Sequence, residues 1–203
     1  MTVQLDRFYP IVESAVWVER LVRFGARFIQ LRMKGQSDPA VRAHVRAAKA
    51  ACESAGAQLV VNDYWRIAIE EACDFVHLGQ DDLADADLPA IRNAGIRIGV
   101  STHDYAELER AIAAEPQYIA LGPIYPTTLK KMPWAPQGLF RIVEWKKLVG
   151  PIPLVAIGGL TVERLTGVFG AGADSAAVVS DIVRNPDPEA RTKEWIAATR
   201  AVH

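Results

Sequence analysis

The sequence predicts a single-domain α/β protein folded as a (β/α)8 barrel, also called a TIM barrel. Short apolar runs alternate with longer amphipathic segments, and the pair recurs eight times, which is typical of parallel strands joined by crossover helices. No linker or change in composition divides the chain, and its 203 residues suit one barrel. We therefore expect residues 1–203 to form one catalytic domain.

The eight apolar runs are the predicted strands, and each precedes a helix-like stretch. In chain order they are residues 7–12, 28–33, 58–63, 75–79, 97–102, 118–124, 154–159 and 175–182. An open doubly wound sheet is the alternative. Its glycine fingerprint is absent after the first strand, where Pro10 to Glu13 stand instead, so the barrel is favoured.

The clearest helix is predicted over residues 38–56. Its apolar positions recur at spacings of four, three and four, at Val41, Val45, Ala48 and Cys52. We expect Asp38 to cap its start, with Pro39 in the first turn, and Gly56 to close its end. The last helix follows residues 185–188 and is expected to turn Trp195 and Ile196 towards the barrel. Its charged residues are predicted to face water: Glu189, Arg191, Lys193 and Glu194.

Composition excludes several classes of function. Lys and Arg number 23 against 24 Asp and Glu, which argues against a nucleic-acid partner. No apolar stretch approaches the roughly 20 residues that span a bilayer, so we expect no membrane partner and a cytoplasmic location. Cys52 and Cys73 lack the close spacing of a metal knuckle and are predicted to be reduced, buried thiols.

Polar residues cluster where the predicted strands end, which in a barrel is the catalytic rim. They are Gln30, Arg32, Lys34, Asn62, Asp63, Gln80, Asp81, Asp82, Ser101, His103, Thr127, Lys130 and Ser180. Alternation places Gln30, Arg32 and Lys34 on one face, predicted to be the barrel interior. An inward Arg–Lys pair is costly unless an anion or internal carboxylates neutralise it, and we favour an anion site.

Asp63 and Asp82 are the predicted metal ligands. Two carboxylates from adjacent strand ends suit Mg²⁺ and leave coordination positions for water and phosphate oxygens. The structural alternatives are a helix N-cap for Asp63 and a solvated turn for Asp81 or Asp82.

Two further segments are candidates for phosphate binding. Residues 122–138 are the longest stretch without periodicity, so we expect a binding loop in which Thr127 and Lys130 hold a diphosphate, while Lys131 is solvated. Gly158 and Gly159, with residues 176–180, match the phosphate cradle at the seventh and eighth strands of a barrel.

Seven ordered motifs resemble thiamine phosphate synthase over about three quarters of the chain. They are QLRMK at 30–34, VND at 61–63, HLGQDD at 77–82, GVSTH at 99–103, LGPIYPT at 121–127 with Lys130, IGG at 157–159 and VVS at 178–180. The family joins 4-amino-2-methyl-5-hydroxymethylpyrimidine diphosphate to hydroxyethylthiazole phosphate, giving thiamine phosphate and pyrophosphate.

The resemblance implies specific site residues. The pyrimidine diphosphate would be held by Gln30, Leu31, Arg32, Met33, Lys34, Asn62, Ser101, Thr127, Thr128, Leu129 and Lys130. Asp63 and Asp82 would bind Mg²⁺. The thiazole phosphate would be received by Gly159, Val179 and Ser180. Arg32, Ser101 and Lys130 would act on the reacting groups.

The chain departs from the family in one motif. The family commonly reads Thr-x-Thr-Lys in the loop after the sixth strand, whereas this chain has Thr127-Thr-Leu-Lys130, so Leu129 offers no hydroxyl group. A lost hydrogen bond of this kind is worth about 1 kcal/mol. Thr128 or a backbone N–H is a candidate replacement.

Two alternatives remain open at this stage. The related thiazole tautomerase shares the barrel and the Gly99 to His103 pattern, but it has no use for a magnesium pair and Lys130. A non-catalytic binder of thiamine phosphate or its precursors is favoured by Leu129 alone. Neither His77 nor His103 is assigned a catalytic role. Self-association is also left open: apolar side chains near Trp134 or Trp145 would suit a subunit interface, although helix packing explains Trp145 equally well.

Overall fold

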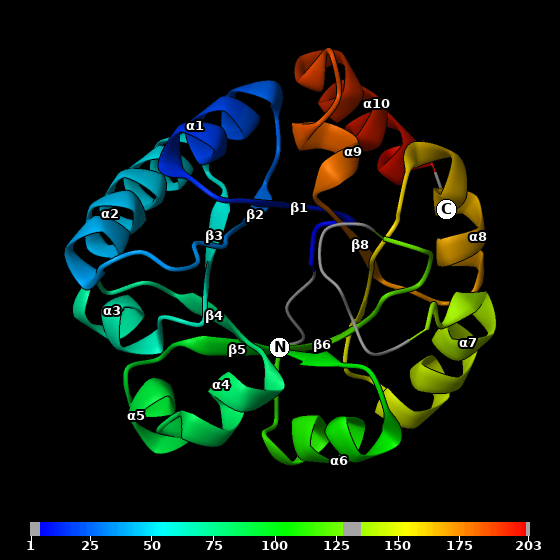
Figure 1. The fold of residues 1–203 in the computed structure, drawn as a ribbon, viewed down its shortest axis with the longest axis horizontal. Helices are drawn as coiled ribbons and strands as arrows, with labels where there is room; N and C mark the ends of the chain where they lie inside the picture. The colour runs from blue at the N-terminus through cyan, green and yellow to red at the C-terminus, as the bar shows by residue number, and fades with distance from the viewer. Residues whose placement is uncertain (1–4, 128–134, 202–203) are drawn as a thin grey trace.

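The computed structural model describes residues 5–127 and 135–201. Eight parallel strands form a closed barrel in chain order, with β8 paired to β1, and helices surround it (Figure 1). The predicted (β/α)8 fold is confirmed. Among the described residues, no helix has the length and apolar character that crossing a bilayer requires.

The strands agree in number and order with the prediction, but most are shorter. They are β1 Phe8–Val12, β2 Phe28–Leu31, β3 Gln58–Asn62, β4 Phe75–Leu78, β5 Arg97–Thr102, β6 Tyr118–Leu121, β7 Leu154–Ile157 and β8 Ser175–Val178. The prediction for β6 was too long because Pro123 has no N–H for the ladder. The prediction for β8 was wrong beyond Val178, because residues 180–183 form a short helix.

The connections between the strands carry the helices. They are α1 Ala15–Phe24, α2 Asp38–Ala55, α3 Trp65–Glu70, α4 Gln80–Asp85, α5 Leu88–Asn93, α6 Tyr105–Ala113, α7 Gly138–Val149, the 3₁₀ helix η1 Val162–Arg164, α8 Leu165–Gly170, α9 Ser180–Val183 and α10 Pro188–Ala201. Because the helices lie outside the sheet, the strands are covered on that face (Figure 1).

Strand alternation divides the apolar core into two layers. The larger layer lies between the sheet and the helices and includes Ile29, Leu31 and Trp195. The smaller layer fills the barrel and includes Tyr9, Phe28, Phe75, Tyr118 and Val155. Residues two positions apart on a strand share a face. Gln30, Asn62, His77 and Ser101 therefore continue the inward rows that start with Phe28, Val60, Phe75 and Gly99.

Helix α2 confirms the predicted apolar stripe. Val41, Val45, Ala48 and Cys52 are all buried. Gly56 follows the helix in the left-handed region, with φ of 63°, and its N–H donates to the carbonyl of Glu53. The prediction for the start was wrong by one residue: Ser37 occupies the cap position, and Asp38 is the first helical residue.

Helix α10 buries Trp195 completely and partly buries Ile196, as predicted. Lys193 and Glu189 form an exposed pair. The prediction that Arg191 faces water was wrong. Its guanidinium binds Asp181 through two hydrogen bonds of 2.8 and 3.1 Å and also contacts Glu163 and Glu194.

Three further side chains that the sequence singled out lie in the core. Both Cys52 and Cys73 are buried and unpaired with each other. Trp145 is fully buried, and its Nε1–H donates to Oγ1 of Thr102 over 3.0 Å. Helix packing therefore accounts for Trp145, and this residue gives no support to a subunit interface.

Candidate active site

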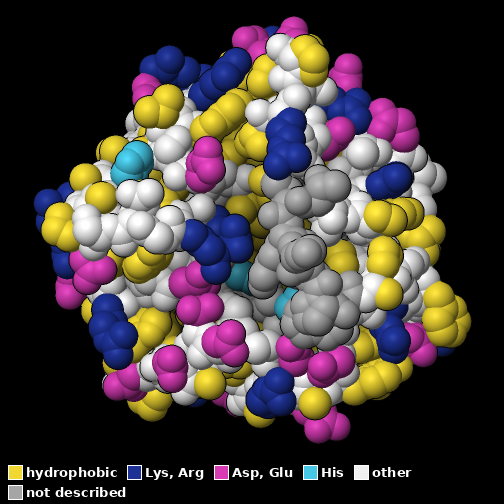
Figure 2. Space-filling model, viewed as in Figure 1, with side chains coloured by type: hydrophobic (Ala, Val, Ile, Leu, Met, Phe, Trp, Pro, Cys, Tyr) yellow, Lys and Arg dark blue, Asp and Glu magenta, His cyan; other side chains and the backbone are white. Residues whose placement is uncertain are grey.

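The carboxyl ends of the strands open on one mouth of the barrel. Figure 2 shows cationic, acidic and histidine side chains gathered around a hollow near the centre of this face. Side chains of opposite charge at such a hollow suit a small, charged ligand.

The cationic motif after β2 lies at the rim. Gln30 is 2 % exposed inside the barrel, as predicted. Arg32 and Lys34 were predicted to point inside as well, but β2 ends at Leu31, so Arg32 is half-buried and Lys34 is exposed. Nζ of Lys34 lies 3.6 Å from the Asp63 carboxylate. Within the described residues, the Arg32 side chain forms no ion pair, so it is available to an anion.

Leu31 and Met33 belong to the core layer outside the barrel. They are only 2 % and 5 % exposed, respectively. Their side chains therefore do not face the mouth. Only the backbone groups of these two residues could make the predicted contact with substrate.

Asp63 follows β3 in a strained backbone conformation, with φ of 65°. Its N–H donates to the carbonyl of His77 over 2.9 Å. Tyr64, and not Asp63, occupies the cap position of α3. The N-cap alternative for Asp63 is therefore wrong, and its carboxyl group does not cap this helix.

The Asp63 and Asp82 carboxyl groups follow different strands but lie close enough for the Asp82 charge to act on Asp63. Burial and the neighbouring Asp82 charge raise the pKa of Asp63, while Lys34 and Arg32 act in the opposite direction. Asp82 is in the first turn of α4, where a Cβ on Gly79 would lie 2.9 Å from its carboxylate. Gly79 therefore leaves room for this carboxylate.

Two facing carboxylates fit a divalent cation. Mg²⁺ typically takes one or two protein carboxylates and completes its shell with water and phosphate oxygens. Among the described residues, no group of three or more His, Cys, Asp or Glu side chains is placed to hold a metal. The donor set therefore suits an ion shared with a phosphate-bearing ligand better than a closed structural metal site.

Asn62 presents an unsatisfied donor beside this pair. Its side chain is 4 % exposed, and its Nδ2 is buried without a hydrogen-bond partner among the described residues. A buried donor without an acceptor costs about 1–3 kcal/mol. A ligand acceptor in the mouth would remove that cost.

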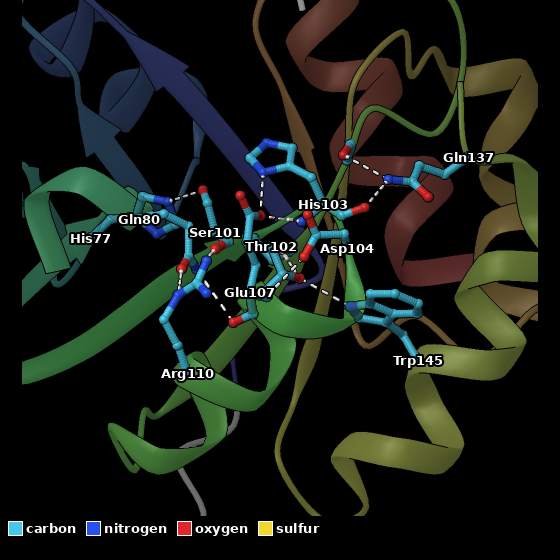
Figure 3. Close-up of polar contacts among 12 residues, drawn as sticks. His77, Gln80, Ser101, Thr102, His103, Asp104, Glu107, Arg110, Gln137 and Trp145 are labelled. Atoms are coloured by element: carbon cyan, nitrogen blue, oxygen red, sulfur yellow. Dashed lines mark hydrogen bonds and ion pairs between the residues drawn. The ribbon is translucent and has the colours of Figure 1, made fainter. Parts of the chain in front are cut away.

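Ser101 lies on the inner face of β5 and is hydrogen-bonded to His77 and Gln80. Its Oγ lies 2.7 Å from Nε2 of His77, and its carbonyl accepts from Nε2 of Gln80 over 2.7 Å (Figure 3). Nε of Arg110 in turn donates to Oε1 of Gln80. Burial lowers the pKa of His77 to about 3, and the Arg32 charge acts in the same direction. His77 is therefore a neutral imidazole at physiological pH.

His103 belongs to a neighbouring cluster at the end of β5, which Gln80 joins to Ser101. Its Nδ1 lies 2.7 Å from the Glu107 carboxylate, which also accepts from the His103 N–H (Figure 3). Nε2 of Gln137 donates to the carbonyl of His103. These bonds connect β5 with α6 and the start of α7, so His103 has a supporting role in this structure.

The glycines after β7 are required by close packing within the protein. A Cβ on Gly158 would lie 2.6 Å from Cα of Pro123, and one on Gly159 would lie 2.5 Å from the carbonyl oxygen of Pro126. The N–H of Tyr125 donates to the carbonyl of Gly158 over 3.0 Å. The loop after β6 is thus seated on β7, which explains these glycines without a ligand.

Val179 and Ser180 follow β8 and begin the short helix α9. Asp181, in the first turn of that helix, accepts hydrogen bonds from Arg191 and from Nε1 of Trp195. Thr127 is half-buried in the loop after β6. The predicted contacts of Thr128, Leu129 and Lys130 lie outside the described residues, as does Trp134.

Sequence reasoning missed the side chains that support the site. They are Tyr9, Tyr118 and Glu107. For the two tyrosines a signal existed, because each occupies an inward position of a predicted strand. Buried tyrosine hydroxyl groups usually need polar partners. Glu107 acts through contacts between different elements, which no local pattern reveals. Gln80 was predicted at the rim, but its hydrogen bond to Ser101 was not.

Comparisons with known proteins agree with this geometry. Residues 8–182 match the family described as thiamine monophosphate synthase. A thiamine-phosphate synthase from Rhizobium etli is 62 % identical over 196 residues, covering 97 % of this chain and 96 % of that protein. The enzyme of the same name from Salmonella typhimurium is 48 % identical, with 93 % and 90 % covered. A solved structure of thiamine phosphate pyrophosphorylase from Pyrococcus furiosus shares the fold, with a TM-score of 0.84, 24 % identity and 96 % of each chain covered.

Proposed function

This chain belongs to the thiamine monophosphate synthase family and is a transferase that makes thiamine phosphate, and we propose that diphosphate leaves the pyrimidine substrate before the thiazole nitrogen attacks. The observation that supports this most is that the Asp63 and Asp82 carboxyl groups are near each other, with Arg32 and Lys34 acting on the same site. Paired carboxylates next to cations are suited to a metal-bound diphosphate.

The proposed reaction needs stabilisation of separating charge. The bond between the pyrimidinylmethyl carbon and the diphosphate oxygen breaks, and its electron pair leaves with pyrophosphate. The thiazole nitrogen then donates its lone pair to that carbon. A neutral thiazole nitrogen has no proton to lose, so no general base is required. The work of the protein is to hold both substrates and to stabilise the leaving group.

The leaving diphosphate is the proposed ligand of the residues after β2 and β3. Arg32 and Lys34 supply positive charge, and Asn62 supplies the Nδ2 donor that has no partner among the described residues. The proposed contacts from the loop after β6 are made by Thr127 and Lys130, together with Thr128 and Leu129 through backbone or side chain. Gln30 and Ser101 lie at the inner end of the same mouth and are proposed to contact the pyrimidine diphosphate.

Asp63 and Asp82 are the proposed Mg²⁺ ligands. When bound, the ion would neutralise charge on the diphosphate. The carboxylates themselves keep the ion at the strand ends, next to the cationic side chains. Small-molecule substrates are the only partners that this site requires. A cytoplasmic location accords with such substrates, and self-association stays a proposal.

The thiazole phosphate is proposed to bind at Gly159, Val179 and Ser180. These residues follow neighbouring strands, β7 and β8, on the same rim as the carboxylates. A phosphate at this rim would place the thiazole ring beside the pyrimidine carbon.

The direct test supplies the purified protein with both substrates and Mg²⁺ and measures thiamine phosphate and pyrophosphate. We expect the two products in equal amounts, with both lost on chelation of the metal. Conversion of a thiazole substrate without pyrophosphate would favour the tautomerase. Binding of both substrates without any product would favour the non-catalytic binder and reject the proposal.

Arg191→Ala is expected to weaken thiazole phosphate binding selectively. The Arg191 side chain is 14 % exposed and joins α10 to Asp181 in α9, next to Ser180. Hydrogen bonds to charged groups contribute about 1.5–3 kcal/mol, so we expect KM for the thiazole phosphate to rise about tenfold or more. Steady-state kinetics should show KM for the pyrimidine diphosphate unchanged.

The matched control is Lys193→Ala on the same helix. Among the described residues, exposed Lys193 forms its ion pair with Glu189, and such pairs contribute little. Equal effects of Arg191→Ala on both KM values would contradict a role at the thiazole phosphate end.

A further inference from the structure

A continuous series of hydrogen bonds crosses the barrel interior from β2 to β5. Nε2 of Gln30 donates to the Tyr9 hydroxyl over 2.8 Å, and the Tyr9 and Tyr118 hydroxyl oxygens lie 2.8 Å apart. The Tyr118 hydroxyl lies 2.8 Å from Nδ1 of His77, whose Nε2 lies 2.7 Å from Oγ of Ser101. We call these five side chains the interior chain.

The interior chain is closed to solvent at one end and open at the other. Tyr118 and Tyr9 are 0 % and 1 % exposed, and Gln30 and His77 are 2 % and 7 % exposed. Ser101 is only half-buried, at the mouth of the barrel. The buried hydroxyl and imidazole hydrogens of the interior chain therefore need acceptors among its own side chains, since an unmade buried hydrogen bond is costly.

This requirement fixes the direction of every bond. The amide nitrogen of Gln30 can only donate, so the Tyr9 hydroxyl accepts from it and directs its own hydrogen to Tyr118. The Tyr118 hydroxyl then donates to Nδ1 of His77. A neutral His77 that accepts at Nδ1 carries its hydrogen on Nε2 and donates it to Ser101.

The opposite direction leaves one hydrogen without an acceptor. If Ser101 donated to His77, Nδ1–H of His77 would donate to Tyr118, and Tyr118 would donate to Tyr9. The Tyr9 hydroxyl would then accept from both Gln30 and Tyr118, and its own hydrogen would have no acceptor among the described residues.

We infer that Tyr118 and His77 are positioning residues that hold the Ser101 hydroxyl group as a hydrogen-bond donor to the pyrimidine diphosphate. Because Ser101 accepts from His77, its own hydrogen is free to point into the mouth. The acceptor is a ring nitrogen or a diphosphate oxygen, and both offer lone pairs to a hydroxyl group. This inference rests on the proposed contact of Ser101 with that substrate.

The barrel is built to hold the tyrosine in this place. A Cβ on Gly99, the residue two before Ser101 on the inner face of β5, would lie 2.1 Å from Cζ of Tyr118. The imidazole of His77 stacks on the Tyr118 ring, with centroids 5.6 Å apart and planes inclined by 13°. The hydroxyl of Tyr118 is thus fixed between Tyr9 and His77.

The first test reads the tautomer of His77 without substrate. Nitrogen-15 NMR of the imidazole, assigned with His77→Gln, is expected to show hydrogen on Nε2 and none on Nδ1 in the wild-type protein. Tyr118→Phe keeps the ring but removes the donor to Nδ1, so the Nδ1 resonance should shift. Hydrogen on Nδ1 in the wild-type protein would overturn the inference, whatever its activity.

The second test asks whether Tyr118 acts through Ser101. We expect Tyr118→Phe and Ser101→Ala each to lower kcat/KM for the pyrimidine diphosphate about tenfold, as for the loss of one hydrogen bond. The double variant should be no worse than Ser101→Ala, since coupled residues are non-additive. KM for the thiazole phosphate should be unchanged. Multiplying effects in the double variant would overturn the inference.

Two other tyrosine variants serve as controls for Tyr118→Phe. Tyr105→Phe removes an exposed hydroxyl that accepts from Arg141, outside the interior chain, and should keep full activity. Tyr9→Phe leaves the donor to His77 in place and should lower kcat/KM less than Tyr118→Phe. If Tyr118→Phe does not fold, Tyr9→Phe is sufficient for the test. We expect Tyr9→Phe to lower kcat/KM slightly in the wild-type background and not at all in the Ser101→Ala background. An equal decrease in both backgrounds would overturn the inference.

Inorganic pyrophosphate distinguishes the two acceptors. If the acceptor is a diphosphate oxygen, Ser101→Ala should weaken inhibition by pyrophosphate about tenfold. If it is a ring nitrogen, that inhibition should be unchanged while kcat/KM falls. Failure of the wild-type protein to form thiamine phosphate would reject the proposed function and leave the His77 tautomer as a separate result.

Discussion

Asp63→Asn is expected to lower the rate of thiamine phosphate formation at least about 100-fold while leaving the fold intact. Metal stabilisation of a leaving group is worth several kcal/mol, and each 1.36 kcal/mol corresponds to a factor of ten. Asparagine keeps the size of the side chain and tolerates the left-handed backbone at φ of 65°. It removes one of the two charges proposed to hold Mg²⁺.

The same substitution should not reduce stability in the absence of metal. Asp63 faces Asp82 in a half-buried site, and two such carboxylates repel each other. The ion pair with Lys34 is 3.6 Å long and exposed at the lysine, so its loss costs little. Chemical denaturation with chelator present should therefore give a free energy of unfolding equal to or above that of the wild-type protein.

The matched control is Asp81→Asn. Asp81 adjoins Asp82 but is exposed, so its loss should leave both the rate and its dependence on Mg²⁺ unchanged. An Asp63→Asn enzyme with wild-type rate, or one whose rate is restored at ordinary Mg²⁺ concentration, would refute the assignment of Asp63 as a metal ligand.

Gly99→Ala is expected to produce the largest loss of stability among single methyl additions in the barrel interior. The new Cβ would lie 2.1 Å from Cζ and 2.4 Å from Cε1 of Tyr118. Tyr118 is fully buried among Phe28, Phe75 and Tyr9, so its ring has little room to move. Overpacking of this kind costs about 1–3 kcal/mol or more, measurable by urea denaturation.

A glycine elsewhere provides the control for this substitution. Gly170 ends helix α8 and does not adopt a positive φ, and a methyl group added to it would meet no atom within 4 Å. Gly170→Ala should be neutral or slightly stabilising. Equal stability of the two variants would contradict the tight fit between Gly99 and Tyr118. Catalytic loss in Gly99→Ala should accompany the loss of stability, because the tyrosine supports His77 and Ser101.

The fold was predictable because its signals are local. The apolar runs and the stripe at Val41, Val45, Ala48 and Cys52 are repeated patterns with the periods of strand and helix. The ends of elements were less accurate. The predicted eighth strand extended to Ile182, yet the chain turns into α9 after Val178, since Val179 and Ile182 fit the apolar side of a short helix as well as a strand.

The composition of the rim was also predictable, although its arrangement was not. Asn62, Asp63, Asp82 and Ser101 all lie at or just after the ends of predicted strands, and parallel strands bring their carboxyl ends to one rim. Arg32 and Lys34 were expected inside because alternation was extended beyond the true end of β2. Once the strand ends, the period of two no longer governs where side chains point.

Periodicity and strand order, which are properties of neighbouring residues, were enough to predict a barrel of eight strands and the set of polar groups at its mouth. Which of those groups meet depends on the three-dimensional fold. The Tyr9 and Tyr118 hydroxyl groups are 109 positions apart in sequence and 2.8 Å apart in space. Such a contact depends on the closure and register of the whole sheet, and no local pattern encodes either.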